Sequence, residues 1–300
     1  DTPLSALALA YLAEKAGFPP GVFNVITTNN PQNIGEILTK SPKIKKISFT
    51  GSSEVGKILI KQSSSTVKKL SMELGGNAPF IIFDDADIDS AVEGVMLSKF
   101  RNSGQTCICA NRIYVQEGVY KLFLEKFISK VKNQKLGSGL DPSVEIGPLI
   151  NKKATNKVLK ILDDALSKGA KILLGGKKHS KGDNFIEPTI VTNISDNMLI
   201  CSAEIFGPVA AIYSFDDEKE IIKTANNSRA GLAAYFYGKD NSKIWRTAEA
   251  LEYGMVGVNT GFISTNLAPF GGVKESGYGR EGSKYGINEY IVLKYICMKI

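Results

Sequence analysis

The sequence predicts an α/β protein built on a mainly parallel sheet. Apolar, β-rich runs alternate with segments of helical periodicity along the whole chain. The 300 residues are 43% hydrophobic, which is enough for one large or two ordinary domains with a packed core. The chain has no internal repeat, no low-complexity tract and no linker rich in Pro and Ser. These observations favour a folded α/β protein over a disordered one.

The alternation starts with a helix at the N-terminal end. Thr2 is a suitable N-cap, Pro3 suits the first helical position, and apolar residues follow at helical spacing until Gly17. The next expected elements are a strand at 21–27, a helix at 31–40, a strand at 43–50 and a helix at 52–62. Further helices are expected near 87–100, 119–134, 152–168, 217–227 and 241–253, with β-rich runs in "APFIIF", "PVAAIYSF" and "LAAYFYG".

Charge and hydropathy exclude two classes of partner. The net charge is +7, but 32 of the 37 basic residues are Lys and they are spread along the chain, as on a solvated surface. We therefore expect no nucleic-acid binding. No apolar run approaches the ~18 residues of a membrane span, so we expect no membrane insertion. The chain opens at Asp1 inside a helix start, so we expect sequence upstream, and a targeting segment cannot be recognised. The expected compartment is the cytoplasm, or the mitochondrion in a eukaryote.

A glycine-containing turn at 49–58 is the first candidate for ligand binding. "FTGSSEVGKI" is nearly a P-loop, but Ile58 replaces the Ser or Thr that would hold Mg²⁺, which argues against a nucleotide hydrolase. A strand that runs through Gly51 and Ser52 into a helix could instead hold a pyrophosphate at the helix N-terminus, which suits a dinucleotide. The alternative is an ordinary strand-to-helix turn.

Cysteine usage favours a nucleophile over a metal site. The four cysteines, Cys107, Cys109, Cys201 and Cys297, form no C-x-x-C pair, and the single His179 lies in a hydrophilic loop. We therefore expect no metal site and no Cys-His hydrolase.

A carboxylate could serve as the base instead. In "MELGGNAPF" (72–80), Glu73 stands in an apolar setting before two glycines that let the backbone approach a ligand. Burial would raise the pKa of its carboxyl toward neutrality, as a general base for water requires. The alternative is an exposed carboxylate at a strand end.

Four motifs taken together resemble the aldehyde dehydrogenase superfamily. They are "MELGGNAPF", the "GQTC" that ends at Cys107, "EIFGP" (204–208) and "PFGGVKESGYGRE" (269–281), in that order and at that spacing. The resemblance covers essentially the whole chain. It implies that Cys107 is the nucleophile and Glu73 the general base. It also implies contacts to NAD or NADP from Gly51, Ser52, Gly56, Leu74, Glu204 and Phe206.

The implied reaction is oxidation of an aldehyde to an acid. A thiolate attacks the aldehyde carbon, hydride leaves the thiohemiacetal for nicotinamide, and water activated by Glu73 hydrolyses the thioester. The Cys107 backbone N–H can donate to the oxyanion. A second donor, a cofactor-binding Lys and the residue that selects NAD or NADP would lie upstream of Asp1, so we expect residues 1–300 alone to be inactive. A non-catalytic homologue of the same fold is the alternative.

The resemblance also suggests an architecture. Residues 1–75 would complete a Rossmann-type dinucleotide-binding domain, 76–275 would form the α/β catalytic domain, and 276–300 would be a C-terminal return and oligomerisation segment. The tail "EYIVLKYICMKI" is β-rich, and an exposed apolar strand is an aggregation hazard unless it is paired. We therefore expect a homodimer or homotetramer.

The expected substrate rests on Arg101. An Arg six residues before the nucleophile would be costly to bury unless it met an anion, and a guanidinium binds a carboxylate bidentately. "FRNSGQTCICANRIYV", "GFIS" (261–264) and "GREGSKYGINEYIVLKYICM" resemble the succinate-semialdehyde dehydrogenases, in which Arg101 and Ser264 would match residues that hold the distal carboxylate. Succinate semialdehyde is therefore preferred to glutarate semialdehyde. The alternative for Arg101 is a salt bridge to a protein carboxylate.

The second cysteine of the motif is a candidate redox partner. In extended backbone, positions i and i+2 face the same side, so a strained Cys107–Cys109 disulfide is conceivable, with reversible inactivation by peroxide. The alternative for Cys109 is core packing.

Overall fold

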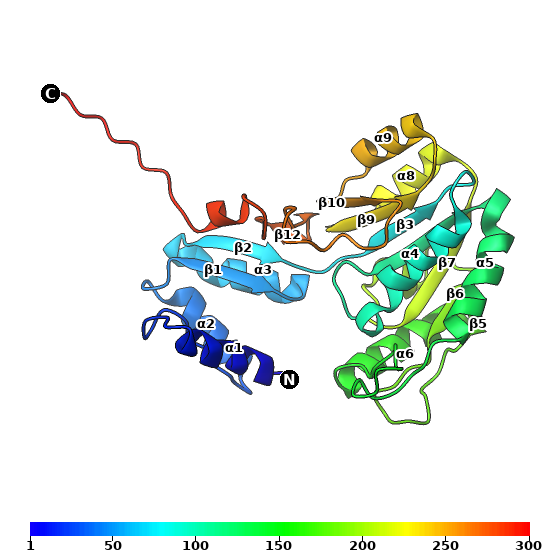
Figure 1. Ribbon diagram of the computed structural model, residues 1–300, viewed down its shortest axis with the longest axis horizontal. Coiled ribbons are helices and arrows are strands. Elements are labelled where there is room, and N and C mark those ends of the chain that lie inside the picture. Colours follow the sequence, from blue (N-terminus) through cyan, green and yellow to red (C-terminus); the bar gives the residue numbers. More distant parts are fainter.

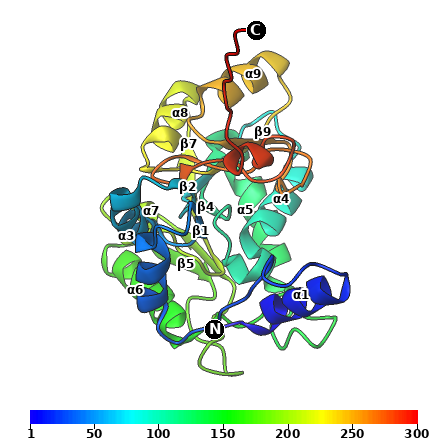
Figure 2. The ribbon, with the colours of Figure 1, turned by 90° about the vertical axis from the view of Figure 1, so that its left-hand side faces the viewer.

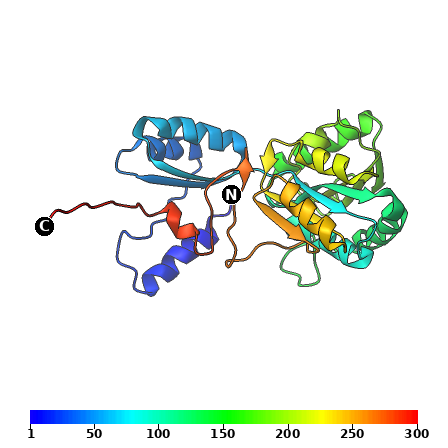
Figure 3. The ribbon, with the colours of Figure 1, turned by 90° about the horizontal axis from the view of Figure 1, so that it is seen from above.

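The structure, a computed structural model that describes residues 1–300, forms two bodies of unequal size (Figure 1). The smaller contains the N-terminal helices, a three-stranded sheet and the C-terminal end of the chain, and the larger contains a seven-stranded sheet. Seen from above, the chain crosses between the bodies only along a few connecting segments (Figure 3). The α/β class predicted from the sequence is confirmed.

The smaller body is a short sheet flanked by helices. Its elements are α1 (Leu4–Lys15), α2 (Pro31–Lys40), β1 (Lys46–Thr50), α3 (Ser53–Ser63), β2 (Lys69–Glu73) and β12 (Gly277–Tyr278). The strand order is β1-β2-β12, with β1 parallel and β12 antiparallel to β2. Helices α2 and α3 lie on one side of the sheet and α1 on the other (Figures 2 and 3). The C-terminal return therefore completes the sheet that the N-terminal part begins.

The larger body is a mainly parallel sheet covered by helices. Its strands are β3 (Ala78–Ile82), β4 (Ala110–Gln116), β5 (Lys171–Leu174), β6 (Thr189–Thr192), β7 (Val209–Phe215), β9 (Ala233–Tyr237) and β10 (Met255–Val258). Its helices are α4 (Ile88–Phe100), α5 (Glu117–Lys132), α6 (Lys152–Ser167), α7 (Leu199–Ser202), α8 (Glu218–Asn226) and α9 (Asn241–Ala250). The strand order is β10-β9-β3-β4-β7-β6-β5, and only β5 runs antiparallel to its neighbour. A separate two-stranded ladder pairs β8 (Ala230–Gly231) with β11 (Val273–Lys274).

The core of the larger body has two faces because successive strand residues point to opposite sides of the sheet. Phe80 and Ile82 of β3 belong to the apolar cluster formed with α4 and α5, whereas Ile81 between them belongs to the cluster formed with α8 and α9. This burial on both faces explains why "APFIIF" is a continuous apolar run instead of an alternating one.

Most of the predicted elements are confirmed, but two predictions near the N-terminal end are wrong. The segment 21–27 forms no strand, because it does not pair with β1, which is the edge strand of the small sheet and pairs only with β2. Helix α1 begins at Leu4, with Pro3 in place of Thr2 at the N-cap and no side-chain cap. The tail 290–300 is exposed coil that extends away from both bodies, and its expected role as an oligomerisation strand stays a prediction (Figure 1).

No helix of the chain combines the length and the apolar composition that a bilayer crossing needs.

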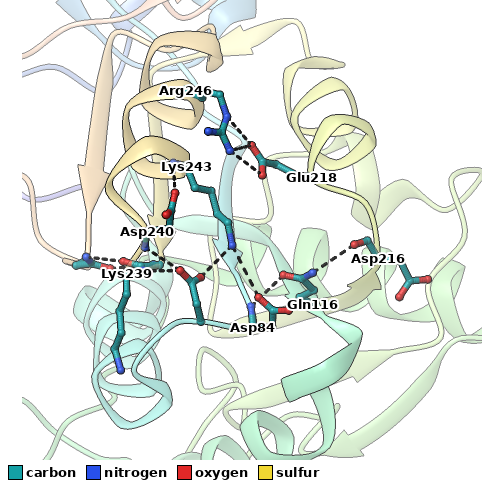
Figure 4. A network of polar contacts seen from close by, with 11 residues as sticks. Asp84, Gln116, Asp216, Glu218, Lys239, Asp240, Lys243 and Arg246 are labelled. Carbon is teal, nitrogen blue, oxygen red and sulfur yellow. Dashed lines mark hydrogen bonds and ion pairs between the residues drawn. The ribbon is translucent and has the colours of Figure 1, made fainter.

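A polar network joins the loops that follow the parallel strands of the larger sheet (Figure 4). Asp85 Oδ2 accepts the backbone N–H groups of Lys239 at 2.9 Å and Asp240 at 2.8 Å. Lys243 Nζ lies 3.2 Å from Asp85 Oδ1 and 5.0 Å from the centre of the Phe83 ring. Burial raises the pKa of Asp85, but these hydrogen bonds and the Lys243 charge outweigh it and leave the pKa below its usual value.

Replacing Asp85 with Asn should destabilise the chain in a pH-dependent way. Because the folded-state pKa is lowered, the carboxylate stabilises the fold above its unfolded pKa of ~3.9, and this contribution is lost as pH falls through the folded value. We expect Asp85→Asn to lower the free energy of unfolding by about 1–3 kcal/mol at pH 7 and by much less near pH 3. Urea unfolding at several pH values measures this difference. Asp163→Asn, on the exposed face of α6, is the control; a difference that stays constant with pH would contradict the prediction.

Candidate active site

Cys107 lies on a sharply bent segment between α4 and β4. Asn102, Ser103 and Gly104 have φ of 52°, 58° and 75°, a run of left-handed residues that is costly for the two that carry a Cβ. Gly104 fits because a Cβ there would lie 2.2 Å from the carbonyl oxygen of Gly207. The Ser103 hydroxyl donates to the Gly147 carbonyl at 2.9 Å. These contacts hold Cys107 half-buried just before β4, at the amino-terminal edge of the larger sheet.

Glu73 is the last residue of β2 and is only 4% exposed. Its Oε2 atom is buried without a hydrogen-bond partner. Burial is the main cause that raises the pKa of Glu73 to about 8, and the negative charge of Glu281 adds to it. The positive charge of Arg280 lowers this pKa but does not outweigh the other two effects. The alternative of an exposed strand-end carboxylate is therefore wrong, and the carboxyl group has the pKa that a base for water needs.

The two glycines after Glu73 bring three segments into contact. A Cβ on Gly76 would lie 2.0 Å from the Cys107 carbonyl oxygen, so the backbones meet where no side chain fits. The Gly76 N–H donates to Glu204 Oε1 at 3.0 Å, and a Cβ on Gly75 would lie 3.0 Å from Glu204 Oε2. The residues predicted from three separate motifs, Glu73, Cys107 and Glu204, therefore share one site.

This site disfavours a free thiolate. Burial, then the negative charges of Glu204 and Glu73, raise the pKa of the Cys107 thiol to about 11, although the backbone N–H groups of Cys107 and Ile108 favour the thiolate. The thiol is consequently protonated at neutral pH in this state. A positive charge beside the sulfur would lower its pKa.

A buried junction that the sequence analysis missed fixes these segments. The Asn77 carbonyl oxygen accepts Arg112 Nε at 3.2 Å and Nη2 at 3.0 Å, and the Asn77 amide donates to the Cys201 carbonyl at 3.1 Å. Asn111 Nδ2 donates to Asn77 Oδ1 and to the Ala203 carbonyl, both at 3.0 Å. The junction thus connects the chain after Gly76 to the residues that precede Glu204.

The C-terminal return adds further contacts that were not predicted. The buried Ser276 hydroxyl donates to the Gly75 carbonyl at 2.7 Å and accepts the Gly231 N–H at 2.9 Å. Arg280 and Glu281, which act on the pKa of Glu73, follow in the same motif. The motif "PFGGVKESGYGRE" marked the C-terminal return as part of the site, but no local pattern predicted the roles of Ser276, Arg280 and Glu281.

The residues predicted to hold a dinucleotide are compatible with one. Gly51 and Ser52 are exposed just before α3, whose first backbone N–H groups have no partner within the helix. The Gly51 N–H itself donates to the Glu73 carbonyl at 3.0 Å. Gly56 is required by packing, because its Cβ would lie 2.5 Å from Cδ2 of the buried Leu74. Lys57 is paired with Glu275 at 3.0 Å, which argues further against a P-loop. Phe206 has φ of 55° and is half-buried two residues after Glu204.

Arg101 has no carboxylate partner. The ion pairs formed by arginine involve Arg229 and Arg246, so the alternative of a protein salt bridge for Arg101 is wrong. Its Cζ atom lies 5.1 Å from the centre of the Phe262 ring, and Ser264 follows in the same loop.

The backbone from Cys107 to Cys109 is not extended, so the geometry on which the predicted disulfide was based is wrong. Residues 106–109 form a turn closed by the Cys109 N–H to the Thr106 carbonyl at 3.2 Å, so the backbone is not extended. Both cysteines are free, and Cys109 is buried with its sulfur 3.5 Å from the Lys99 carbonyl. Cys109 therefore packs in the core, and its role as a redox partner stays a prediction.

Comparison with known proteins identifies the family. A model of the aldehyde dehydrogenase family matches residues 1–296. The mitochondrial succinate-semialdehyde dehydrogenase of rice is 58% identical over 297 residues, which are 99% of this chain and 56% of that protein. The glutarate-semialdehyde dehydrogenase of Pseudomonas aeruginosa is 54% identical over 298 residues, 99% of this chain and 62% of that protein.

A solved structure supports the same family assignment. The crystal structure of an NADP-dependent enzyme of Escherichia coli has a TM-score of 0.98 at 55% identity, covering 100% of this chain and 62% of that one. The chain thus spans about 56–62% of the length of these relatives. The superfamily predicted from the four motifs is confirmed, and the chain belongs to the aldehyde dehydrogenase family.

Proposed function

We propose that this chain carries the catalytic part of an enzyme that oxidises succinate semialdehyde to succinate with NAD or NADP. The observation that carries the substrate assignment is the unpaired guanidinium of Arg101, six residues before Cys107. The names of the rice and Pseudomonas relatives, both of which describe aldehydes with a distal carboxylate, support it. Glutarate semialdehyde, one methylene longer, is the second candidate because of the Pseudomonas relative.

The chain's own residues supply the covalent chemistry of the proposed mechanism. The Cys107 thiol gives up its proton to the Glu73 carboxylate, which passes it to solvent. The sulfur attacks the aldehyde carbon, and the Cys107 backbone N–H donates to the oxygen that becomes negative. When bound, NAD or NADP accepts the hydride that leaves the thiohemiacetal carbon. Glu73 then takes a proton from water, which attacks the thioester and releases the acid and the Cys107 thiol. Glu204 and Phe206 orient the nicotinamide end of the cofactor, and Gly51 and Ser52 bind its phosphates.

We further propose the domain division of the family for this chain, with boundaries near residues 75 and 275. The two bodies of Figure 1 support it. The exposed apolar tail, in which Leu293 is 99% and Tyr295 88% exposed, supports pairing with a second copy in a homodimer or homotetramer. For the compartment, we propose the cytoplasm, or the mitochondrion in a eukaryote, and the name of the rice relative supports the second.

Replacing Arg101 with Leu tests the substrate assignment. The experiment uses the full-length protein, meaning this chain completed at its N-terminal side as in its relatives. We expect kcat/KM for succinate semialdehyde to fall roughly 30- to 900-fold, which corresponds to a loss of about 2–4 kcal/mol in transition-state stabilisation, because the substrate carboxylate loses its charged partner. Butyraldehyde, which has no carboxylate, should be oxidised as before.

The matched control is Arg229→Leu, which removes an 84% exposed arginine side chain. Equal losses on both aldehydes in Arg101→Leu would show that Arg101 is structural. The ratio of kcat/KM for succinate and glutarate semialdehyde decides between the two candidate substrates.

A further inference from the structure

The contact between Arg101 and Phe262 has no place in the mechanism described above. The Arg101 Cζ atom lies 5.1 Å from the centre of the Phe262 ring, within the range of a cation–π interaction. The guanidinium makes no ion pair with the protein. The ring is 46% exposed, so its burial contributes only part of what a core phenylalanine gains. The Arg101 guanidinium is therefore a specific partner of this ring.

The loop that carries Phe262 is fastened to the helix that leads to Arg101. A Cβ on Gly261 would lie 2.0 Å from the carbonyl oxygen of Gly94 in α4, so the two backbones are in direct contact. Gly94 precedes Arg101 by seven residues, about two helical turns. The loop of the ring is thus attached to the helix at whose C-terminal end Arg101 lies.

Two further contacts define the conformation of this loop. The Asn259 side chain accepts the Gly238 N–H at 3.0 Å and donates to the Gly238 carbonyl at 2.9 Å, which fixes the start of the loop to the end of β9. The Thr260 hydroxyl accepts the Phe262 N–H at 3.2 Å and donates to its carbonyl at 3.1 Å. Phe262 is consequently presented from a closed turn instead of a freely moving segment.

We propose that Phe262 is a positioning residue that orients the Arg101 guanidinium for the distal carboxylate of the substrate. The ring attracts the cation electrostatically, and the guanidinium donors are not engaged in any ion pair with the protein. Those donors remain for a carboxylate, which a guanidinium binds with two parallel hydrogen bonds. This inference rests on the proposed function and adds a determinant of its specificity.

Phe262→Leu in the full-length protein removes the aromatic ring and keeps an apolar side chain. We expect KM for succinate semialdehyde to rise about 3- to 30-fold, the range of a cation–π interaction, while kcat changes little. Kinetics with butyraldehyde should be unchanged, and Phe262→Tyr should retain the wild-type KM. Trp245→Leu, which removes a 69% exposed aromatic side chain from α9, is the control.

A series of fluorinated phenylalanines at position 262 keeps the shape of the ring and weakens its attraction for a cation step by step. KM should rise with each added fluorine. This series also tests the inference if Phe262→Leu does not fold. An unchanged KM across the series would overturn the inference.

The double variant Arg101→Leu, Phe262→Leu separates this inference from the function on which it rests. If Phe262 acts through Arg101, its replacement should have no further effect once Arg101 is absent. A selective loss in Arg101→Leu with none in Phe262→Leu would overturn only the role of Phe262. Equal losses on both aldehydes in Arg101→Leu would overturn the substrate assignment itself.

Discussion

Replacing Cys107 with Ser should reduce aldehyde oxidation by the full-length protein roughly 10⁴-fold or more, since no other group can form the covalent intermediate. The structure offers no substitute nucleophile beside Glu73 and Glu204. Cys109 is buried, and its sulfur lies against the Lys99 carbonyl. A serine hydroxyl, less acidic than a thiol, would also have to ionise next to the two carboxylates that already raise the pKa of the thiol.

Intact-protein mass spectrometry and steady-state rates with succinate semialdehyde measure this effect. Cofactor affinity should be unchanged in Cys107→Ser, because none of the proposed phosphate or ribose contacts is altered. Cys201→Ser is the matched control, since its side chain contacts the Ser195 carbonyl and the Tyr213 hydroxyl, away from the proposed reaction. Substantial turnover by Cys107→Ser would refute the assignment of the nucleophile.

Elements with a strong local pattern could be predicted from the sequence. Strand β3 lies within a continuous apolar run and α6 has clear helical periodicity, and both form as expected. The segment 21–27 is also β-rich but forms no strand, because strand formation depends on a neighbouring strand and the chain places none beside it. Composition alone therefore could not distinguish a paired strand from an unpaired one.

The candidate site was predictable where one motif carries one function. Glu73, Cys107 and Glu204 each stand in a recognisable motif, and the structure brings all three together. The groups that hold them were not predictable, because Asn77 reaches Cys201 across 124 positions and Ser276 reaches Gly75 across 201. The turn at Cys107 was missed for a related reason. It depends on the approach of Gly104 to Gly207, which spacing between cysteines does not reveal.

Replacing Glu73 with Gln should stop the reaction at the thioester. The amide has almost the same shape as the carboxylate but cannot take a proton from water, so we expect hydrolysis to slow by roughly 10²–10⁴-fold while the first hydride transfer proceeds. A burst of reduced cofactor equal to the concentration of active sites, followed by accumulation of a succinyl-enzyme in mass spectra, would establish this. Glu249→Gln, on exposed α9, is the control. An unchanged steady-state rate in Glu73→Gln would assign the base elsewhere.

The pH dependence of the same step gives an independent measurement. Because burial and the Glu281 charge raise the pKa of Glu73 to about 8, most of this carboxyl is protonated at pH 7 and is inactive as a base. Thioester hydrolysis in the wild-type protein should therefore accelerate as pH rises, with a midpoint near pH 8. Removing the neighbouring charge with Glu281→Gln should move this midpoint to lower pH, and Glu73→Gln should abolish the dependence. A midpoint that stays in place in Glu281→Gln would show that burial alone sets the pKa of the base.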